Sequence, residues 1–131
     1  MRKTIIETNL EEVSALTVDM ESNLLYWAES GQKIECSSLE GDNRHVIFEA
    51  MVLHPISIAV YDNYLYWIER EQKVIERINK LSETGKQTVY NRIPHLTDII
   101  SVEKMDTNVS SLSCLVRVSL NSLFIVFSET K

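Results

Sequence analysis

The sequence predicts an all-β fold of the propeller kind, built from repeated four-stranded sheets. The first observation is a pentad that occurs twice, at 25–29 (LYWAE) and 65–69 (LYWIE), with its tryptophans 40 residues apart. The second is that turn signals and β-branched runs recur around both copies, as repeat architectures require. The third is a further cycle that begins at 95–102. A repeat of about forty residues with four short strands is the size of one propeller blade.

The first cycle is expected to contain five strands separated by turns. Each run is β-branched or alternates apolar and polar residues, which favours strands. Turns are expected at 19–23, at 30–32, where Gly31 can adopt positive φ, and at the hairpin signal 40–43. The five strands are predicted at 4–8, 15–18, 24–28, 34–39 and 46–48.

The second cycle restarts at Pro55 with the same spacing. Leu16, Ile58 and Ile99 fall at one position of the three cycles, 42 and 41 residues apart. A four-stranded sheet has two apolar faces and cannot bury both alone, so the sheets are expected to stack around an axis. A helix over 74–80 is disfavoured by the β-branched pattern around it. The strands are predicted at 56–60, 64–68, 74–78 and 88–90, with turns at 62–63, 71–72 and 82–86.

The repeat region is assigned to residues 1–104, and residues 105–131 form a divergent tail. The tail does not repeat the pentad, but 115–118 and 123–127 predict two strands with a turn near Asn121 and Ser122. Two interpretations stay open. The tail is either a foreign or mis-joined segment, or an added hairpin that covers an exposed sheet edge.

Composition narrows the function class. The net charge of −6 and the absence of a basic run argue against nucleic-acid binding. Cys36 and Cys114 lack metal-ligand spacing and form either one disulfide in a secreted protein or two free thiols. No signal peptide is visible at the start of the sequence, and the apolar stretch 114–127 is shorter than the ~20 residues of a membrane helix. We therefore expect no direct membrane insertion by this chain.

The two pentads and their surroundings resemble the YWTD repeats of the low-density-lipoprotein-receptor class B family. The resemblance extends from about residue 2 to 104 and points to the last propeller of the arrow-like Wnt co-receptors, which are low-density lipoprotein receptor-related proteins. It implies blades of a six-bladed propeller, of which this chain holds about two. The segments that carry it are 34–44 (IECSSLEGDNR), 63–70 (NYLYWIER), 72–78 (QKVIERI) and 93–103 (IPHLTDIISVE).

The sequence departs from the family pattern in two ways. Glu29 and Glu69 stand where the motif has Asp, and Ala28 and Ile68 stand where it has Thr. The resemblance implies that the acid makes structural hydrogen bonds between blades. A complete propeller needs several more repeats, and the EGF-like module that follows the last propeller in the family is absent. We therefore expect a fragment or a truncated gene product that either self-associates or is only partly ordered.

The aromatic pairs are the first candidate site. Tyr26 and Trp27, like Tyr66 and Trp67, point to opposite faces of their strand because side chains alternate. They form either a ligand-facing cluster or inter-blade packing, and we favour packing. The motif residues Tyr26, Trp27, Glu29, Tyr66, Trp67 and Glu69 are thus expected to be structural.

Metal, cofactor and catalytic sites are not expected. The histidines His45, His54 and His95 are the candidate metal ligands, but only His54 and His95 fall at similar places in their repeats, and no third ligand is evident beside them. None of the common catalytic motifs occurs. The scattered acids Glu69, Glu71 and Glu76 are interpreted as a solvated face, and Asn108 heads an N-glycosylation sequon.

The function implied by the resemblance is protein recognition at the cell surface, as part of a membrane receptor. The partners would be secreted Wnt ligands or Wnt antagonists, held on loops at one propeller face. The alternative is a lipoprotein-receptor or nidogen-like matrix adhesion propeller. A calcium-dependent propeller hydrolase is a third, less favoured reading, and we expect no enzyme.

Overall fold

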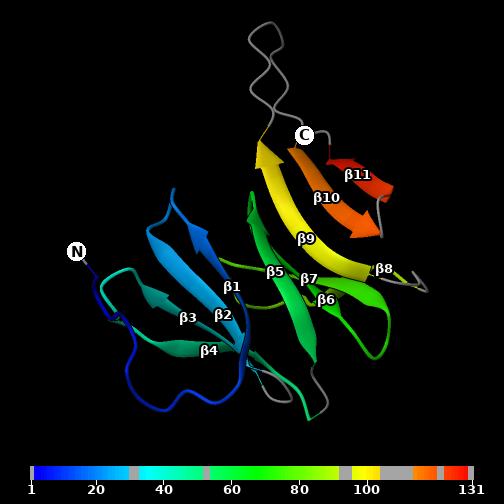
Figure 1. Cartoon of the computed structure of the whole chain (residues 1–131). Coiled ribbons are helices and arrows are strands. Elements are labelled where there is room, and N and C mark those ends of the chain that lie inside the picture. The colour runs from blue at the N-terminus through cyan, green and yellow to red at the C-terminus, as the bar shows by residue number, and fades with distance from the viewer. Residues whose placement is uncertain are drawn as a thin grey trace, which may run out of the picture.

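The described part of the computed structural model consists of strands and the turns between them (Figure 1). Residues 2–29, 33–51 and 54–91 are described in full, and three further strands are described by their backbone alone. The strands in chain order are β1 (Val13–Asp19), β2 (Leu24–Glu29), β3 (Lys33–Ser38), β4 (His45–Glu49), β5 (Pro55–Tyr61), β6 (Tyr64–Glu69), β7 (Val74–Asn79), β8 (Gln87–Tyr90), β9 (Leu96–Glu103), β10 (Cys114–Leu120) and β11 (Leu123–Glu129).

The strands form three antiparallel sheets, which confirms the predicted all-β fold. Blade 1 has the order β1-β2-β3-β4, and blade 2 has the order β5-β6-β7-β8. The third sheet has the order β11-β10-β9. β5 of blade 2 packs against β1 of blade 1 and β9 of the third sheet (Figure 1). The sheets therefore follow one another through their first strands, as propeller blades do.

Blades 1 and 2 repeat each other down to single residue pairs. Trp27 lies opposite Leu16 and Glu35, and Trp67 lies opposite Ile58 and Glu76. Both blades carry an irregularity at the start of the first strand, between Val13 and Ala15 in one and between Pro55 and Ser57 in the other. The sequence repeat is thus also a repeat of backbone register and bulge position.

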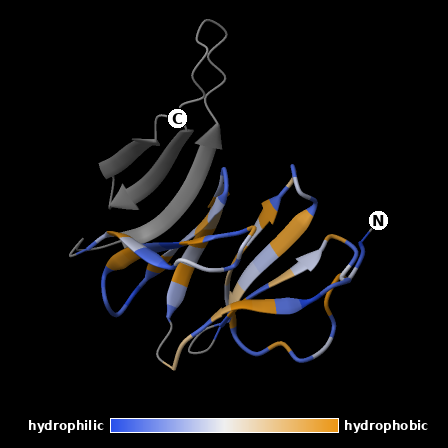
Figure 2. Cartoon of the chain, turned by 180° about the vertical axis from the view of Figure 1, so that it is seen from behind, coloured by the Kyte–Doolittle hydropathy of each residue, from blue (hydrophilic) through white to orange (hydrophobic). Residues whose placement is uncertain are grey.

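The side chains that the structure describes form two hydrophobic clusters, which lie on opposite sides of blade 2. The hydrophobic residues are concentrated on the strands, whereas the connections between strands are largely hydrophilic (Figure 2). The smaller cluster contains Ala59, Tyr66, Ile68 and Ile75. The larger cluster joins blades 1 and 2 and contains Tyr26, Ala28, Ile34, Cys36, Ile47, Ile58, Leu65, Trp67 and Ile78.

The predicted turns within the described residues are confirmed. Asn23 and Asp62 turn the first hairpin of each blade with positive φ, a conformation that Asn and Asp tolerate better than most residues. Gly41 has φ +92°, and a Cβ there would lie 2.4 Å from the Ile5 carbonyl oxygen, so the β3–β4 turn requires glycine. Gly31 lies outside the described residues.

The strand predicted at 4–8 is wrong. Residues 4–8 belong to none of the described strands, and their chain runs beside the β3–β4 turn of blade 1, where Ile5 meets Gly41. A β-branched run forms a strand only with a partner along its edge. By its distance from β1 this segment corresponds to β4, the fourth strand of a blade.

The two strands predicted in the tail are confirmed as β10 and β11. β10 pairs with β9 from Glu103 to Leu96, so β9 has a covered edge, as the added-hairpin interpretation requires. The boundary at residue 104 stays a prediction. The segment 74–79 is a strand, β7, and not a helix.

Candidate functional site: the inter-blade motif and its polar network

The four aromatic residues of the repeated pentads lie inside the molecule. Trp67 has 0% of its surface exposed, and Tyr26, Trp27 and Tyr66 have 1%, 3% and 2%. An aromatic cluster open to a ligand needs accessible rings, and these are not accessible. All four rings are thus buried among other side chains.

Tyrosine and tryptophan serve opposite faces of the blade. Tyr26 of blade 1 and Trp67 of blade 2 share the larger core cluster, where the Phe48 and Trp67 rings lie 5.3 Å apart. Tyr66 belongs to the other cluster, on the opposite side of blade 2. Tyr26 therefore faces the next blade and Trp67 the preceding one, so both large rings of the motif take part in packing between blades.

The acid of the pentad binds backbone groups where the chain enters its own blade. Glu69 Oε2 accepts a hydrogen bond from the His54 backbone N–H at 2.8 Å, just before β5. Glu29 Oε2 accepts one from the Glu11 backbone N–H at 3.3 Å, before β1. His54 lies at the end of the connection between blades 1 and 2, so Glu69 holds the end of this connection against blade 2. The longer side chain of Glu reaches this position in both repeats.

The two tryptophans differ in their indole nitrogens. Trp27 Nε1 donates to Glu29 Oε1 at 3.2 Å. Trp67 Nε1 is buried and has no hydrogen-bond partner among the described residues. An unpaired buried donor costs free energy, so Trp67 stabilises its site through packing area alone.

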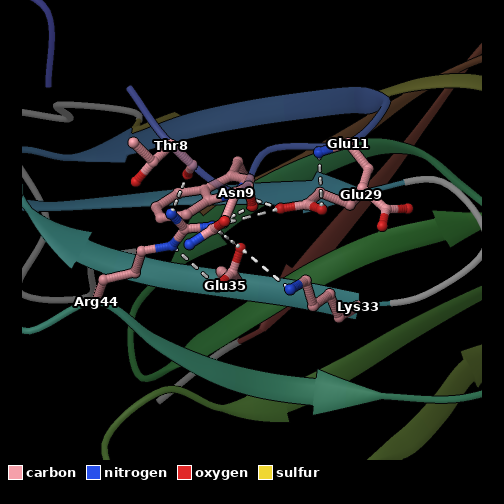
Figure 3. A network of polar contacts seen from close by, with 8 residues as sticks. Thr8, Asn9, Glu11, Glu29, Lys33, Glu35 and Arg44 are labelled. Carbon is pink, nitrogen blue, oxygen red and sulfur yellow. Dashed lines mark hydrogen bonds and ion pairs between the residues drawn. The ribbon is translucent and has the colours of Figure 1, made fainter. Parts of the chain in front are cut away.

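Arg44 organises a polar network on the Trp27 side of blade 1 (Figure 3). Its guanidinium donates to both carboxylate oxygens of Glu35 at 3.1 and 2.9 Å and lies 5.4 Å from the Trp27 ring centroid. It also donates to the Thr8 and Asn9 carbonyl oxygens at 2.6 and 2.8 Å. Arg44 thereby fastens the segment that precedes β1 to the sheet.

The electrostatics of the network follow from burial and charge. Burial by itself raises the pKa of Glu35, but the Arg44 guanidinium and, at 3.8 Å, the Lys33 ammonium favour the charged form. The net effect holds the pKa of Glu35 below its usual value. Glu35 is therefore an ionised, paired carboxylate and not a proton donor.

Blade 2 repeats the arrangement with lysine in place of arginine. Glu76 corresponds to Glu35 and accepts a hydrogen bond from Lys86 at 3.0 Å, while the Lys86 ammonium lies 5.6 Å from the Phe48 ring centroid. The interpretation of Glu69 and Glu76 as a solvated face is wrong, because both are buried, and only Glu71 is exposed. The signal in the sequence that could have revealed these buried acids is a cation directly before each fourth strand. The two cations are Arg44 and Lys86.

One buried ion pair joins the two blades and was not foreseen. Lys80 Nζ lies 2.6 Å from Asp19 Oδ2, and both side chains are nearly inaccessible. The partners are 61 residues apart in the chain. Burial raises the pKa of Asp19, but its hydrogen bonds from Lys80 and Ser22 outweigh this effect and lower the pKa.

The remaining candidate residues are dispersed. No group of three His, Cys, Asp or Glu side chains in the described part of the chain is arranged to hold a metal ion. His54 contributes its backbone N–H to Glu69, whereas His95, Cys114 and Asn108 lie outside the residues with described side chains. Among the described residues there is no helix long and apolar enough to span a membrane.

His45 is expected to make the stability of the blade pair depend on pH. Its Nδ1 faces the Asn43 carbonyl oxygen at 2.7 Å, and its Nε2 faces Glu83 of blade 2. A charged imidazolium donates to both acceptors, a neutral ring to only one, and both contacts raise the pKa of His45 above 6.5.

The contribution of His45 is therefore complete below pH 6.5 and is lost as the pH rises through the folded-state pKa. Urea unfolding of the wild-type protein and of His45→Gln at pH about 5.5 and about 8.5 should show the larger difference at the lower pH. Glu83→Gln, which keeps the shape of the partner, should reduce that pH dependence. A difference that is equal at both values would contradict the assignment.

Cys36 is expected to be chemically inert in the folded protein. Its side chain is buried next to Tyr26, and burial raises the pKa of the Cys36 thiol to about 11. The reactive species is the thiolate, of which about 0.1% is present at pH about 8. Iodoacetamide should leave the Cys36 peptide unlabelled in the native protein and label it fully in denaturant, as read by mass spectrometry. Labelling of the native protein at the rate of a free thiol would refute the prediction.

Known proteins match this chain at the level of both sequence and fold. The low-density lipoprotein receptor repeat class B family matches residues 23–61. Low-density lipoprotein receptor-related protein 5 of Mus musculus is 35% identical over 105 residues, which is 79% of this chain and 6% of that protein. Low-density lipoprotein receptor-related protein 4 of Mus musculus is 34% identical over 90 residues, which is 68% of this chain and 5% of that protein.

A solved structure supports the architecture. A chain in the crystal structure of a nidogen/laminin complex superposes with a TM-score of 0.70 at 18% identity, over 99% of this chain and 51% of that chain. At this level of identity the likeness concerns the fold. The present chain spans only 5–6% of the length of the curated relatives that it matches.

Proposed function

We propose that this chain, which belongs to the low-density lipoprotein receptor class B repeat family, is an extracellular protein-binding segment of a receptor-related, six-bladed type of β-propeller. We further propose that its ligands are secreted Wnt proteins or their antagonists. The observation that carries the proposal is the repeated class B unit, shared at 35% identity with receptor-related protein 5 over 79% of this chain.

Recognition in this proposal is non-covalent and uses the turns, because the repeat motif is buried. The β1–β2 and β7–β8 turns lie at one end of the blades, and each exposes an apolar side chain, Met20 and Leu81, both 73% exposed. Asp19 and Lys80, their neighbours in the chain, form the buried inter-blade ion pair, so the two apolar residues flank a rigid junction. Ligand contacts on loops held by a rigid scaffold are the usual arrangement for binding proteins.

The test is a direct binding measurement on the immobilised chain. Purified Wnt protein and a secreted Wnt antagonist are passed over it by biolayer interferometry, with laminin as a third analyte. We expect saturable binding of a Wnt or an antagonist that weakens by about 10-fold or more in the Met20→Ser, Leu81→Ser double variant, because exposed apolar anchors dominate such contacts. The matched control is Met51→Ser, which alters an exposed methionine at the opposite end of blade 1.

The other outcomes decide against the proposal. Binding of laminin alone would favour the adhesion alternative, for which the fold likeness to the nidogen/laminin chain is the motive. Binding that the Met20 and Leu81 changes leave intact would refute the assigned surface. Calcium-dependent ester hydrolysis by the purified chain would contradict the proposed receptor function.

A further inference from the structure

The first strand of blade 1 exposes an apolar face. Val13, Leu16 and Val18 are 43%, 61% and 43% exposed. Leu16 lies opposite Trp27 and Val18 opposite Leu25 in the β1–β2 pairing, so these side chains lie on the side of the blade that carries Trp27. The segment before β1 and Arg44 cover Trp27 itself and leave the β1 part of this face open.

The same positions of blade 2 form an interface between blades. Ile58 and Leu65 correspond to Leu16 and Leu25, and they are 5% and 0% exposed because they pack with Trp67 against blade 1. The apolar face of blade 1 therefore has the chemistry and the register of a surface that receives another blade. In blade 2, the sheet that packs against this face is the preceding one, blade 1.

The third sheet has one described strand fewer than each of the two complete blades. Each blade has four strands, whereas the third sheet has three described strands, and β11 pairs with β10 alone among them. The segment 4–8 is β-branched and lies outside the described strands. It begins nine residues before β1, as β8 begins nine residues before β9. The chain thus carries an unused fourth strand and a sheet that has a place for one.

We propose that two copies of this chain close head to tail into one six-bladed ring. In this dimer residues 4–8 of each copy add to β11 of the other copy as its fourth strand, and the Leu16 face of each blade 1 packs on the third sheet of the partner. Three sheets are half of six blades, so a heterologous contact of this kind returns to its start after two copies. The chain accordingly covers 51% of the matched nidogen/laminin chain.

The start of the chain is arranged for such an exchange. Arg44 holds the Thr8 and Asn9 carbonyl oxygens on blade 1, which fixes the point where the segment 4–8 departs from blade 1. Ile5 and Ile6 are only half-buried beside the β3–β4 turn, so moving them uncovers little apolar surface. Backbone pairing with β11 would supply the one neighbouring strand that an edge strand needs, and the segment has none among the described strands.

The oligomeric state of the intact chain tests the proposal. Light scattering and sedimentation equilibrium should give a concentration-dependent species of about twice 15.1 kDa. Leu16→Asp, on the apolar face, and Ile5→Pro, which removes a strand donor, should each weaken dimerisation by about 100-fold. Met51→Asp and Arg2→Pro make the same chemical changes at exposed positions outside both contacts and should leave the dimer intact.

A second measurement separates loss of the dimer from loss of the fold. The amides of residues 4–8 should be protected from hydrogen exchange in the wild-type dimer and exchange freely in Leu16→Asp, while those of β6 stay protected in both. The proposal is overturned by a monomer at all concentrations, by open-ended oligomers, or by a dimer that is insensitive to both changes.

Discussion

Replacing Trp67 with alanine is expected to lower the free energy of unfolding by about 3–5 kcal/mol, the usual cost of removing a large buried aromatic side chain. Trp67 has no exposed surface, contacts Phe48 and belongs to the cluster that joins blades 1 and 2. Urea denaturation followed by circular dichroism measures the change. The loss acts on the contact between the blades, so the unfolding transition should also broaden.

Trp67→Phe is the informative control for this experiment. The indole N–H of Trp67 has no partner among the described residues, so Phe removes an unpaired polar group along with part of the ring. Trp27→Phe instead leaves the Glu29 carboxylate without its indole donor. We expect Trp67→Phe to cost less than Trp27→Phe. An alanine variant of Trp67 that loses less than about 1 kcal/mol would contradict the packing role.

Lys80→Met is expected to destabilise the protein by about 3–5 kcal/mol, because it leaves the buried Asp19 carboxylate without its counter-charge. The ammonium of Lys80 and the carboxylate of Asp19 are 2.6 Å apart, and their side chains are 6% and 5% exposed. The Asp19→Asn, Lys80→Met double variant should recover part of the loss, since it removes both charges. Chemical denaturation gives the free energy of unfolding of the wild-type protein, of Lys80→Met and of the double variant. Lys73→Met, at an exposed position, is the matched control.

The ion pair of Asp19 and Lys80 also predicts that the free energy of unfolding falls at acid pH. We call this fall the acid limb of the curve of stability against pH. The pKa of Asp19 is lowered from 3.8 in the folded protein, so its contribution is present above pH 3.8 and is lost as the pH falls through the folded-state value. Lys80→Met should flatten this limb because the lowered pKa depends on the lysine. An unchanged acid limb in the variant would mean that the Ser22 hydrogen bonds alone set the pKa of Asp19.

The repeat was the part of this protein that the sequence could reveal. Trp27 and Trp67 sit in the same register because alternation and turn chemistry are local, so the strands around them and the turns at Asn23 and Asp62 were predictable. The repetition of a tyrosine beside a tryptophan also indicated two apolar faces and hence stacked blades. The hairpin of β10 and β11 followed from its own alternation of residues.

Burial of the acids was not predictable by the same means. Glu76 resembles any polar residue on a strand, and only its partner Lys86, directly before β8, shows why it is inside. The ion pair joins Asp19, at the end of β1, to Lys80, directly after β7, and these two places meet only when the blades stack. A charged residue is buried when a counter-charge arrives in three dimensions, which local sequence does not encode.

The segment 4–8 shows both what local sequence determines and what tertiary structure determines. Its β-branched sequence determines that it can be a strand, and its spacing before β1 determines which strand of a blade it would be. Whether it becomes one depends on a sheet edge next to it, and in this structure it lies beside Gly41 instead. The sequence by itself determined the period, the strands and the motif. Tertiary structure decided which charges are paired and which strands have partners, because both depend on groups that are distant in the chain.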